Sequence, residues 1–212
     1  MKIELENVLP SEIEKRSFEI IQSELPHALD PELAPIIKRV IHATADFDYA
    51  DSLYFSPNAV QRALQALQSG ATIITDTNMA LSGVNKAALS ALNCKACCFM
   101  ADADIAAAAK QNGSTRAAAS MDKASQLDGP LLFAIGNAPT ALVRLYERIE
   151  DGALRPALII GAPVGFVNVV QAKELIIRTE IPCIVARGRK GGSGVAAAIV
   201  NALLYRLPIG IS

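Results

Sequence analysis

The sequence predicts an α/β fold, a three-layer α/β/α sandwich built around a parallel sheet, and three observations support this prediction. Short apolar segments alternate with segments that carry helix start signals, which is the pattern of a parallel sheet covered by helices on both faces. Hydrophobic residues make up 51% of the chain and aromatic residues only 5%, which is typical of closely packed helices and strands. The length of 212 residues is enough to bury the core of one domain and is short for two.

Residues 1–50 predict a helical extension that precedes the sheet. Ser11 and Glu14 have the spacing of a capping box at the start of a first helix. Asp30 can cap a second helix, in which Pro31 suits the first position. The second helix has an apolar stripe that should face the core, formed by Leu33, Ile36, Ile37, Val40 and Ile41.

The segment 56–206 predicts a doubly wound sheet. Its short apolar stretches are expected to be strands, over Ala71–Thr75, Cys94–Met100, Leu131–Ile135, Ala157–Ile160 and Cys183–Ala186. Helix start signals lie between and around these stretches, at Ser56-Pro57, Asp102, Ser114-Thr115, Gly136–Thr140 and Gly192-Ser193. Five parallel strands joined in this way fit a flavodoxin-like sheet. We see no linker or sequence repeat, so residues 1–212 are predicted to form a single domain.

The loops that follow the strands are the expected ligand-binding edge, because open α/β sheets bind ligands beyond the carboxyl ends of their strands. Four of these loops are rich in Gly, Pro and small polar residues: Thr75–Met79, Gly136–Pro139, Gly161–Phe166 and Arg187–Ser193. Helix N-termini direct backbone N–H groups toward the same edge, where they stabilise carboxylates or phosphates.

Composition and charge exclude several classes of function. Twenty basic and twenty-one acidic residues leave almost no net charge, which argues against nucleic acid or an anionic membrane as a partner. The N-terminus has no signal-peptide pattern, and the longest apolar stretch, 156–170, is broken by Gly and Pro, so we expect a cytoplasmic protein. Cys94 and Cys97 have the spacing of half a zinc site, but no second pair completes it. We therefore expect reduced, structural cysteines and no metal site.

His42 is the candidate catalytic residue that helix periodicity singles out. At about 100° per residue, it falls opposite the apolar stripe of its helix, with Arg39 one turn before it and Asp46 one turn after it. It therefore faces either solvent or a cleft. A histidine can act as acid or base near neutral pH, and an exposed histidine without a function is the alternative. Ser17 lies on the apolar face of the first helix, so its hydroxyl is either bonded back to that helix or aimed into a cleft.

Two basic features allow more than one interpretation. Segment 192–197 loosely matches a dinucleotide-binding G-x-G-x-x-A motif, but no strand follows its helix, and Lys190 precedes the glycines instead of following them as a Walker A motif requires. The cations of 187–193 form either a carboxylate site or a solvated basic turn. Arg116, at a helix start where its charge opposes the helix dipole, indicates either a ligand or a surface salt bridge.

These motifs recur, in the same order, in a known family. They are Arg16-Ser17-Phe18, Arg39-Val-Ile-His42-Ala, Phe55-Ser-Pro57, Gly113-Ser-Thr-Arg116, Gly136-Asn-Ala-Pro-Thr140-Ala-Leu, Gly161-Ala-Pro-Val-Gly165-Phe-Val and Arg187-Gly-Arg-Lys-Gly-Gly-Ser193. The chain from about Ser11 to Leu204 closely resembles the precorrin-8X methylmutase family of cobalamin biosynthesis, also called cobalt-precorrin-8 methylmutase.

The resemblance implies an isomerase that uses no organic cofactor. In this family a methyl group migrates from C-11 to C-12 of a precorrin-8 type tetrapyrrole by a 1,5-sigmatropic shift, and the product is hydrogenobyrinate or its cobalt counterpart. The family histidine that donates or accepts a proton matches His42, and the family's substrate-contacting serine and arginine match Ser17 and Arg39. The family is flavodoxin-like and dimeric, so a homodimer is expected. Whether the substrate already contains cobalt stays open.

The residues themselves fit this chemistry, because a rearrangement needs no nucleophile, metal or hydride carrier. A large apolar ring with many carboxylates calls for arginines, helix N-termini and apolar walls. We therefore expect substrate contacts from Thr75, Asp76, Thr77, Met79, Arg116, Asn137, Gly165, Phe166, Arg187 and Gly188. Two alternatives remain: a carrier protein that binds the tetrapyrrole product without turnover, and a flavodoxin-like nucleotide binder.

Overall fold

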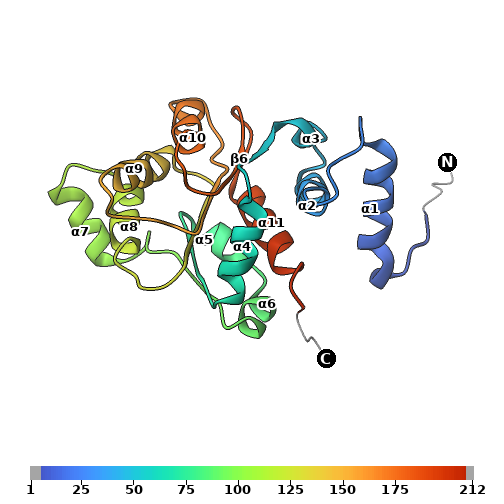
Figure 1. The fold of residues 1–212 in the computed structure, drawn as a ribbon, viewed down its shortest axis with the longest axis horizontal. Helices are drawn as coiled ribbons and strands as arrows, with labels where there is room; N and C mark the ends of the chain where they lie inside the picture. The colour runs from blue at the N-terminus through green and yellow to red at the C-terminus, as the bar shows by residue number, and fades with distance from the viewer. Residues whose placement is uncertain (1–5, 209–212) are drawn as a thin grey trace, which may run out of the picture.

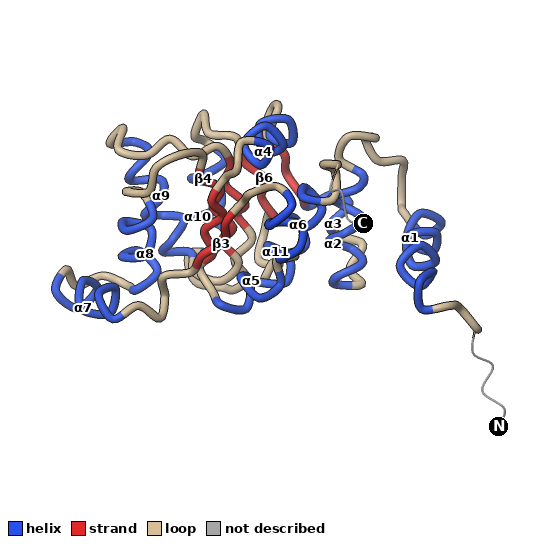
Figure 2. Tube along the Cα trace, turned by 90° about the horizontal axis from the view of Figure 1, so that it is seen from below, coloured by secondary structure: helices blue, strands red, loops and turns tan. Residues whose placement is uncertain are grey.

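The computed structural model describes residues 6–208, which form a six-stranded, mostly parallel sheet between layers of helices (Figures 1 and 2). The strands are β1 (Leu53–Phe55), β2 (Thr72–Thr75), β3 (Lys95–Cys97), β4 (Leu131–Ile135), β5 (Leu158–Gly161) and β6 (Cys183–Ala186). Their order across the sheet is β1-β6-β5-β4-β2-β3. All neighbours pair in parallel except β1, which is antiparallel to β6. The predicted α/β class is confirmed.

The helices connect and cover these strands. They are the 3-10 helix η1 (Pro10–Glu12), α1 (Ile13–Glu24), α2 (Ala34–Thr44), α3 (Tyr49–Ser52), α4 (Ala59–Gln68), α5 (Asn78–Gly83), α6 (Lys86–Ala91), α7 (Ala103–Gln111), α8 (Arg116–Ala124), α9 (Pro139–Glu150), α10 (Val169–Ile177) and α11 (Ser193–Leu204). Among the residues described, no helix is both long and apolar enough to cross a membrane.

Strand β1 corrects the prediction of a five-stranded, fully parallel sheet. Three residues are too few to show the alternation that identifies a strand in a sequence. Its pairing with β6 is extended at both ends, because the Arg187 N–H donates to Ser52 O (2.8 Å) and the Ser56 N–H donates to Cys183 O (2.9 Å). Since α3 leads directly into β1, the chain enters this edge from the helical extension and runs opposite to its neighbour.

Some of the predicted helix starts are confirmed and others are wrong. Thr115 caps α8, because its Oγ1 accepts a hydrogen bond from the Ala118 N–H at 3.1 Å. The capping box at Ser11 does not form: a 3-10 turn begins at Pro10 and α1 follows without a side-chain cap.

The second helix also starts later than predicted, at Ala34 instead of Pro31. Asp30 Oδ1 accepts from the Glu32 N–H (2.7 Å) within a preceding turn, and Pro35 occupies one of the first two helical positions. The sequence prediction named no helix at α3, α5, α6 or α10. The first three are short, and none of the four follows one of the predicted start signals.

The core lies on both faces of the sheet, as alternate strand residues require. In β4, Leu132 and Ala134 pack with the core formed by α2, α4 and α11, whereas Leu131, Phe133 and Ile135 pack with α8, α9 and α10. Figure 2 shows the strands between these two groups of helices, with α1 outermost beyond α2 and α7 at the opposite end. Helix α1 therefore covers α2 and not the sheet itself.

The direction of α2 brings the helical extension to the ligand-binding edge of the sheet. Arg206, just after α11, donates to Glu32 O near the start of α2 (2.6 Å). Lys190, just before α11, binds Asp46 beyond the end of α2 (2.7 Å). The two helices thus run antiparallel, and the last turn of α2 lies beside the carboxyl ends of the strands.

Candidate functional site

His42 occupies the last turn of α2, on the side away from the core. The apolar stripe of the helix is buried, with Ile36, Ile37, Val40 and Ile41 at most 4% exposed, whereas His42 is exposed. This is the orientation that the periodicity predicts. The imidazole stacks on the ring of Phe18 from α1, with 5.5 Å between ring centroids and 27° between ring planes. Helix α1 therefore fixes one face of the imidazole and leaves the residue accessible.

Arg39 is held one turn before His42 by contacts on several sides. Its guanidinium lies 4.8 Å from the centroid of the Phe18 ring and 5.1 Å from that of Tyr205. It also forms an ion pair with Glu14 at 2.7 Å, and this hydrogen bond lowers the pKa of the Glu14 carboxyl. Phe18 thus contacts both Arg39 and His42, so α1 and α2 place the two side chains as one unit.

A cavity of about 470 Å³ lies beside this unit, between α1, α2 and the end of α11. Its wall combines aromatic rings, Phe18 and Tyr205, with the cations Lys38, Arg39 and Arg206. Ser17 does not point its hydrogen at a ligand, because its hydroxyl donates to Ile13 O in its own helix at 2.9 Å. This is the first of the two arrangements expected for a hydroxyl on that face.

Asp46 contacts the basic loop, Arg187–Ser193, and not His42. Lys190 Nζ lies 2.7 Å from Asp46 Oδ2 and 2.5 Å from Asp48 Oδ2. The hydrogen bond from Lys190 lowers the pKa of the Asp46 carboxyl. These two ion pairs fasten the end of the helical extension to the carboxyl edge of the sheet.

Asp76, which follows β2, is buried and fully engaged inside the protein. Its carboxylate accepts hydrogen bonds from the backbone N–H groups of Gly136 (2.8 Å), Asn137 (2.8 Å) and Ala138 (2.6 Å). Burial raises the pKa of Asp76, and the three N–H groups oppose that rise. The carboxylate therefore shapes the loop that leads into α9, and its oxygens face backbone donors instead of the solvent.

The threonines beside Asp76 are also bonded within the protein. Thr75 Oγ1 donates to Thr77 O at 3.1 Å. Thr77 Oγ1 accepts from the Ala80 N–H (3.0 Å), which caps α5, and lies 2.7 Å from Ser193 Oγ. In contrast, Met79 at the start of α5 is 74% exposed. The loop after β2 thus fixes the start of α11 and presents one apolar side chain to solvent.

The loops after β5 and β6 are joined along their backbones. The Gly165 N–H donates to Arg189 O (3.1 Å) and the Gly192 N–H donates to Ala162 O (2.8 Å). Beyond this junction Phe166 is 82% exposed, and the Arg189 guanidinium lies 5.5 Å from its ring centroid. Other large apolar side chains are exposed in the same segment, namely Val164 and Val167. The edge therefore presents apolar surface next to cations.

Two further predicted arginines lie at this edge, beside different strands. Arg187 is exposed, 4.9 Å from the Tyr54 ring centroid and 3.5 Å from Glu174. Arg116 starts α8, and the contact between Thr115 Oγ1 and Thr140 Oγ1 (3.0 Å) places it next to the start of α9, where the exposed Asn137 also lies. Within residues 6–208, Arg116 has no ion-pair partner. The structure thus distributes its cations along the edge and does not gather them into one cluster.

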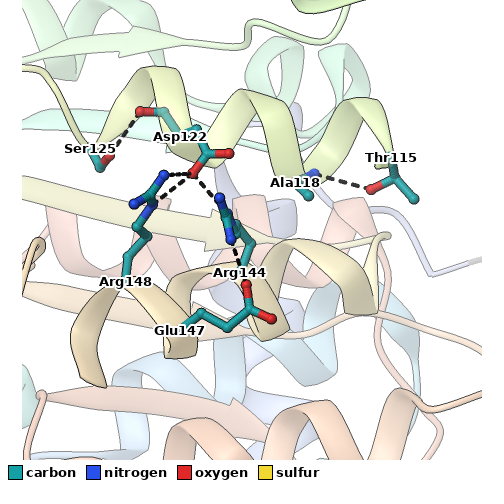
Figure 3. A network of polar contacts seen from close by, with 7 residues as sticks. All are labelled: Thr115, Ala118, Asp122, Ser125, Arg144, Glu147 and Arg148. Atoms are coloured by element: carbon teal, nitrogen blue, oxygen red, sulfur yellow. Dashed lines mark hydrogen bonds and ion pairs between the residues drawn. The ribbon is translucent and has the colours of Figure 1, made fainter. Parts of the chain in front are cut away.

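A polar network holds α8, which begins at Arg116, against α9 (Figure 3). Asp122 Oδ1 accepts from Arg144 Nε (2.8 Å) and Arg148 Nε (2.7 Å), and Arg144 also binds Glu147 (2.7 Å). Burial raises the pKa of Asp122, but the hydrogen bonds from Arg144 and Arg148 outweigh the effect of burial, so the pKa of Asp122 is lowered. This network positions the helix that carries Arg116.

Lys173 is a residue near the site that the sequence prediction missed. It lies on the buried face of α10 with Val169, Ala172 and Ile176, and none of it is exposed (0%). The sequence signal was a lysine on the apolar face of a helix, because lysine side chains are ordinarily exposed to solvent. Its Nζ donates to Gly188 O and to Lys190 O, both at 2.8 Å. Among the described residues, no group of three or more His, Cys, Asp or Glu side chains could hold a metal ion.

Comparisons with known proteins show which family the chain is similar to. The sequence model of the family described as Precorrin-8X methylmutase matches residues 12–206. A cobalt-precorrin-8 methylmutase of Leptospira interrogans is 43% identical over 201 residues, which cover 91% of each chain. A precorrin-8X methylmutase of Pseudomonas aeruginosa is 42% identical and covers 90% of this chain and 93% of its own. The crystal structure of a precorrin-8x methyl mutase from Thermus thermophilus superposes with a TM-score of 0.85 at 41% identity, over 92% of this chain and 95% of the other.

Proposed function

The chain belongs to the precorrin-8X methylmutase family, and we propose that it is an isomerase of corrin ring biosynthesis acting on a precorrin-8 type tetrapyrrole. The observation that carries the proposal is the place of His42. The imidazole is accessible, stacked on Phe18, and held at the edge of the sheet where cations and apolar side chains meet.

The reaction is an isomerisation, so its atoms balance without a co-reactant. The bond between the methyl carbon and C-11 breaks while the bond to C-12 forms, and the ring's π electrons shift in the same 1,5-sigmatropic step. His42 gives one proton to the conjugated ring or takes one from it and reverses that transfer afterwards. A positioned acid or base of this kind accelerates a reaction about 10²–10⁴-fold. Arg39 contacts the substrate beside His42, and Ser17 contacts it through its hydroxyl oxygen, because the hydroxyl hydrogen is donated to Ile13 O.

The substrate's shape and charge match the carboxyl edge of the sheet. Its apolar ring lies against Met79, Val164 and Phe166, which are 74%, 49% and 82% exposed. Its peripheral carboxylates bind Arg116 and Arg187, together with the exposed side chain of Asn137 and the loops that contain Gly165 and Gly188. Thr75, Asp76 and Thr77 contribute through the loop geometry that they fix.

The molecule is further proposed to be a single-domain, cytoplasmic homodimer. The continuous sheet supports one domain. Counted among themselves, the five parallel strands lie in the order 2-1-3-4-5, which supports a flavodoxin-like core with β1 added at one edge. Exposure of Phe166 (82%) and Val167 (77%) supports a partner subunit that completes the site, and sedimentation velocity distinguishes dimer from monomer.

The test compares the chain's two histidines. His42→Ala is expected to lower kcat at least a hundredfold, measured as the absorbance change when the C-11-methyl substrate is converted. His27→Ala is the matched control and should keep wild-type turnover, because His27 pairs with Asp51 and faces solvent. Equal rates for His42→Ala and wild type would remove His42 from the mechanism.

The second candidate function, a tetrapyrrole carrier, is favoured by the same edge, since its apolar and basic groups suit product as well as substrate. Purified protein that binds product but never converts substrate would establish the carrier. Parallel incubations with metal-free and cobalt-containing precorrin-8 decide which form is the substrate.

A further inference from the structure

Lys173 places a charged amine beneath the basic loop, where it has no carboxylate partner. The side chain is fully buried, and its Nζ donates to the carbonyl oxygens of Gly188 and Lys190 at 2.8 Å each. Within the described part of the chain it forms no ion pair. Burying an unpaired charge is costly, and an apolar side chain of similar length would fill the same space. The role of the ammonium therefore lies in its two hydrogen bonds to the loop.

Its two hydrogen bonds determine which way the loop's peptide groups face. In a planar trans peptide, the C=O and the following N–H point in opposite directions. When the carbonyls of Gly188 and Lys190 turn inward to Lys173, the N–H groups of Arg189 and Gly191 turn away from the protein interior. Neither N–H has an acceptor among residues 6–208. Backbone N–H groups that face outward from a turn provide donors for a bound anion.

We propose that Lys173 is a positioning residue that turns the Arg189 and Gly191 N–H groups outward, where they bind one carboxylate of the tetrapyrrole. This inference rests on the proposed function, which supplies the polycarboxylate ligand. The anion meets the two N–H groups together with the positive side chains of the same loop. The buried ammonium adds a fixed charge behind them that solvent does not screen.

Neighbouring contacts keep the loop in this conformation. The Gly192 N–H donates to Ala162 O (2.8 Å), and a Cβ on Gly191 would lie 2.2 Å from that same oxygen, so the backbone approaches closely only because Gly191 has no side chain. At the other end of the loop, the Gly165 N–H donates to Arg189 O (3.1 Å). The loop is thus held from two directions, by Lys173 from within and by the β5 loop from the side.

The charged groups around Lys173 are already paired with others. Glu174, on its own helix, lies 3.5 Å from Arg187, and Lys190 binds Asp46 and Asp48. On α9, which packs against α10, the charged side chains turn toward α8 or solvent: Arg144, Glu147 and Arg148. Burial alone lowers the pKa of Lys173 to about 8. The ammonium is therefore still charged at neutral pH and loses its proton in mildly alkaline solution.

The experiment replaces Lys173 by methionine, which keeps the length and removes the amine, with Lys110→Met on the exposed face of α7 as the matched control. Binding of hydrogenobyrinate is followed by absorbance titration, and KM and kcat are measured on precorrin-8. Lys173→Met is expected to raise both Kd and KM about tenfold, equivalent to about 1.4 kcal/mol, with kcat within about twofold of wild type. Lys110→Met should match wild type in all three.

Two further readouts separate positioning from a purely structural role. Product affinity of the wild type should fall between pH 7 and pH 9, as Lys173 loses its proton, and should change less in Lys173→Met. Hydrogen exchange at the Arg189 and Gly191 amides should slow when product binds to wild type.

A folded Lys173→Met with wild-type Kd, or an unchanged exchange rate at both amides in the wild-type complex, would overturn the inference. The exchange measurement needs no variant, so it decides even if Lys173→Met fails to fold. If wild type converts no substrate, the proposed isomerase fails instead, and product binding still tests Lys173.

Discussion

Replacing Asp76 by asparagine tests whether this buried carboxylate is structural. Its two oxygens accept three backbone N–H groups: Oδ1 from Gly136, and Oδ2 from Asn137 and Ala138. An amide has a single acceptor oxygen, so Asp76→Asn can keep at most the two bonds made by Oδ2. Its NH₂ group then faces the Gly136 N–H, donor against donor.

The expected loss of stability follows from that count. One hydrogen bond to a charged group contributes about 1.5–3 kcal/mol, and the substitution also removes a carboxylate whose pKa is raised by burial, which offsets part of the loss. A net destabilisation of about 2 kcal/mol lowers the Tm by roughly 4–8 °C for a chain of this size. Product affinity should stay within about threefold of wild type, because the carboxylate faces backbone donors.

Thermal unfolding followed by circular dichroism, with a parallel hydrogenobyrinate titration, measures both quantities. Asp128→Asn, in the exposed loop before β4, is the matched control and should change the Tm by no more than about 2 °C. An unchanged Tm for Asp76→Asn combined with a tenfold weaker affinity would refute the reasoning and make Asp76 a substrate ligand.

Two other substitutions test the frame around the site. Gly191→Ala should lower the free energy of unfolding by more than about 2 kcal/mol, because its Cβ would meet Ala162 O at 2.2 Å. Gly194→Ala is the control and should leave that free energy nearly unchanged, because its Cβ meets nothing within 4 Å. Urea unfolding measures both. Asp122→Asn should cost about 2 kcal/mol at pH 7. Because the pKa of Asp122 is lowered in the fold, its contribution is present above its unfolded pKa and disappears as pH falls through the folded value. A deficit for Asp122→Asn that stays the same as the pH is lowered from 7 into the acid range would contradict this.

The orientation of His42 was predictable because the pattern of α2 is strong. Ile36, Ile37, Val40 and Ile41 define one buried face, and a residue on the far side of such a helix must be accessible. The five parallel strands were predictable for the same reason, since each is a short apolar run followed by turn residues. The stacking of His42 on Phe18 was not predictable, because it depends on how α1 packs on α2.

The predictions from the sequence were wrong or incomplete where contacts between distant segments of the chain decide the structure. Strand β1 exists through its bonds to β6, more than a hundred residues later in the chain. Asp76 was predicted to contact the substrate, yet its carboxylate accepts three N–H groups from the loop after β4. Lys173 was not among the predicted site residues, although its spacing places it among apolar residues of α10. The local sequence pattern shows which residues share one face of a helix or strand. It does not show which distant residues pack against that face.

The two outermost strands have a consequence for solubility. Strands β1 and β3 each contain three residues, so the sheet presents few unpaired backbone groups on which a second chain could add a strand. Lys95, exposed in β3, further opposes such an addition. The apolar segments Leu131–Ile135 and Cys183–Ala186, which would aggregate readily as free peptides, lie in the interior of the sheet. Aggregation of this protein should therefore follow the population of unfolded chains and not the concentration of folded ones.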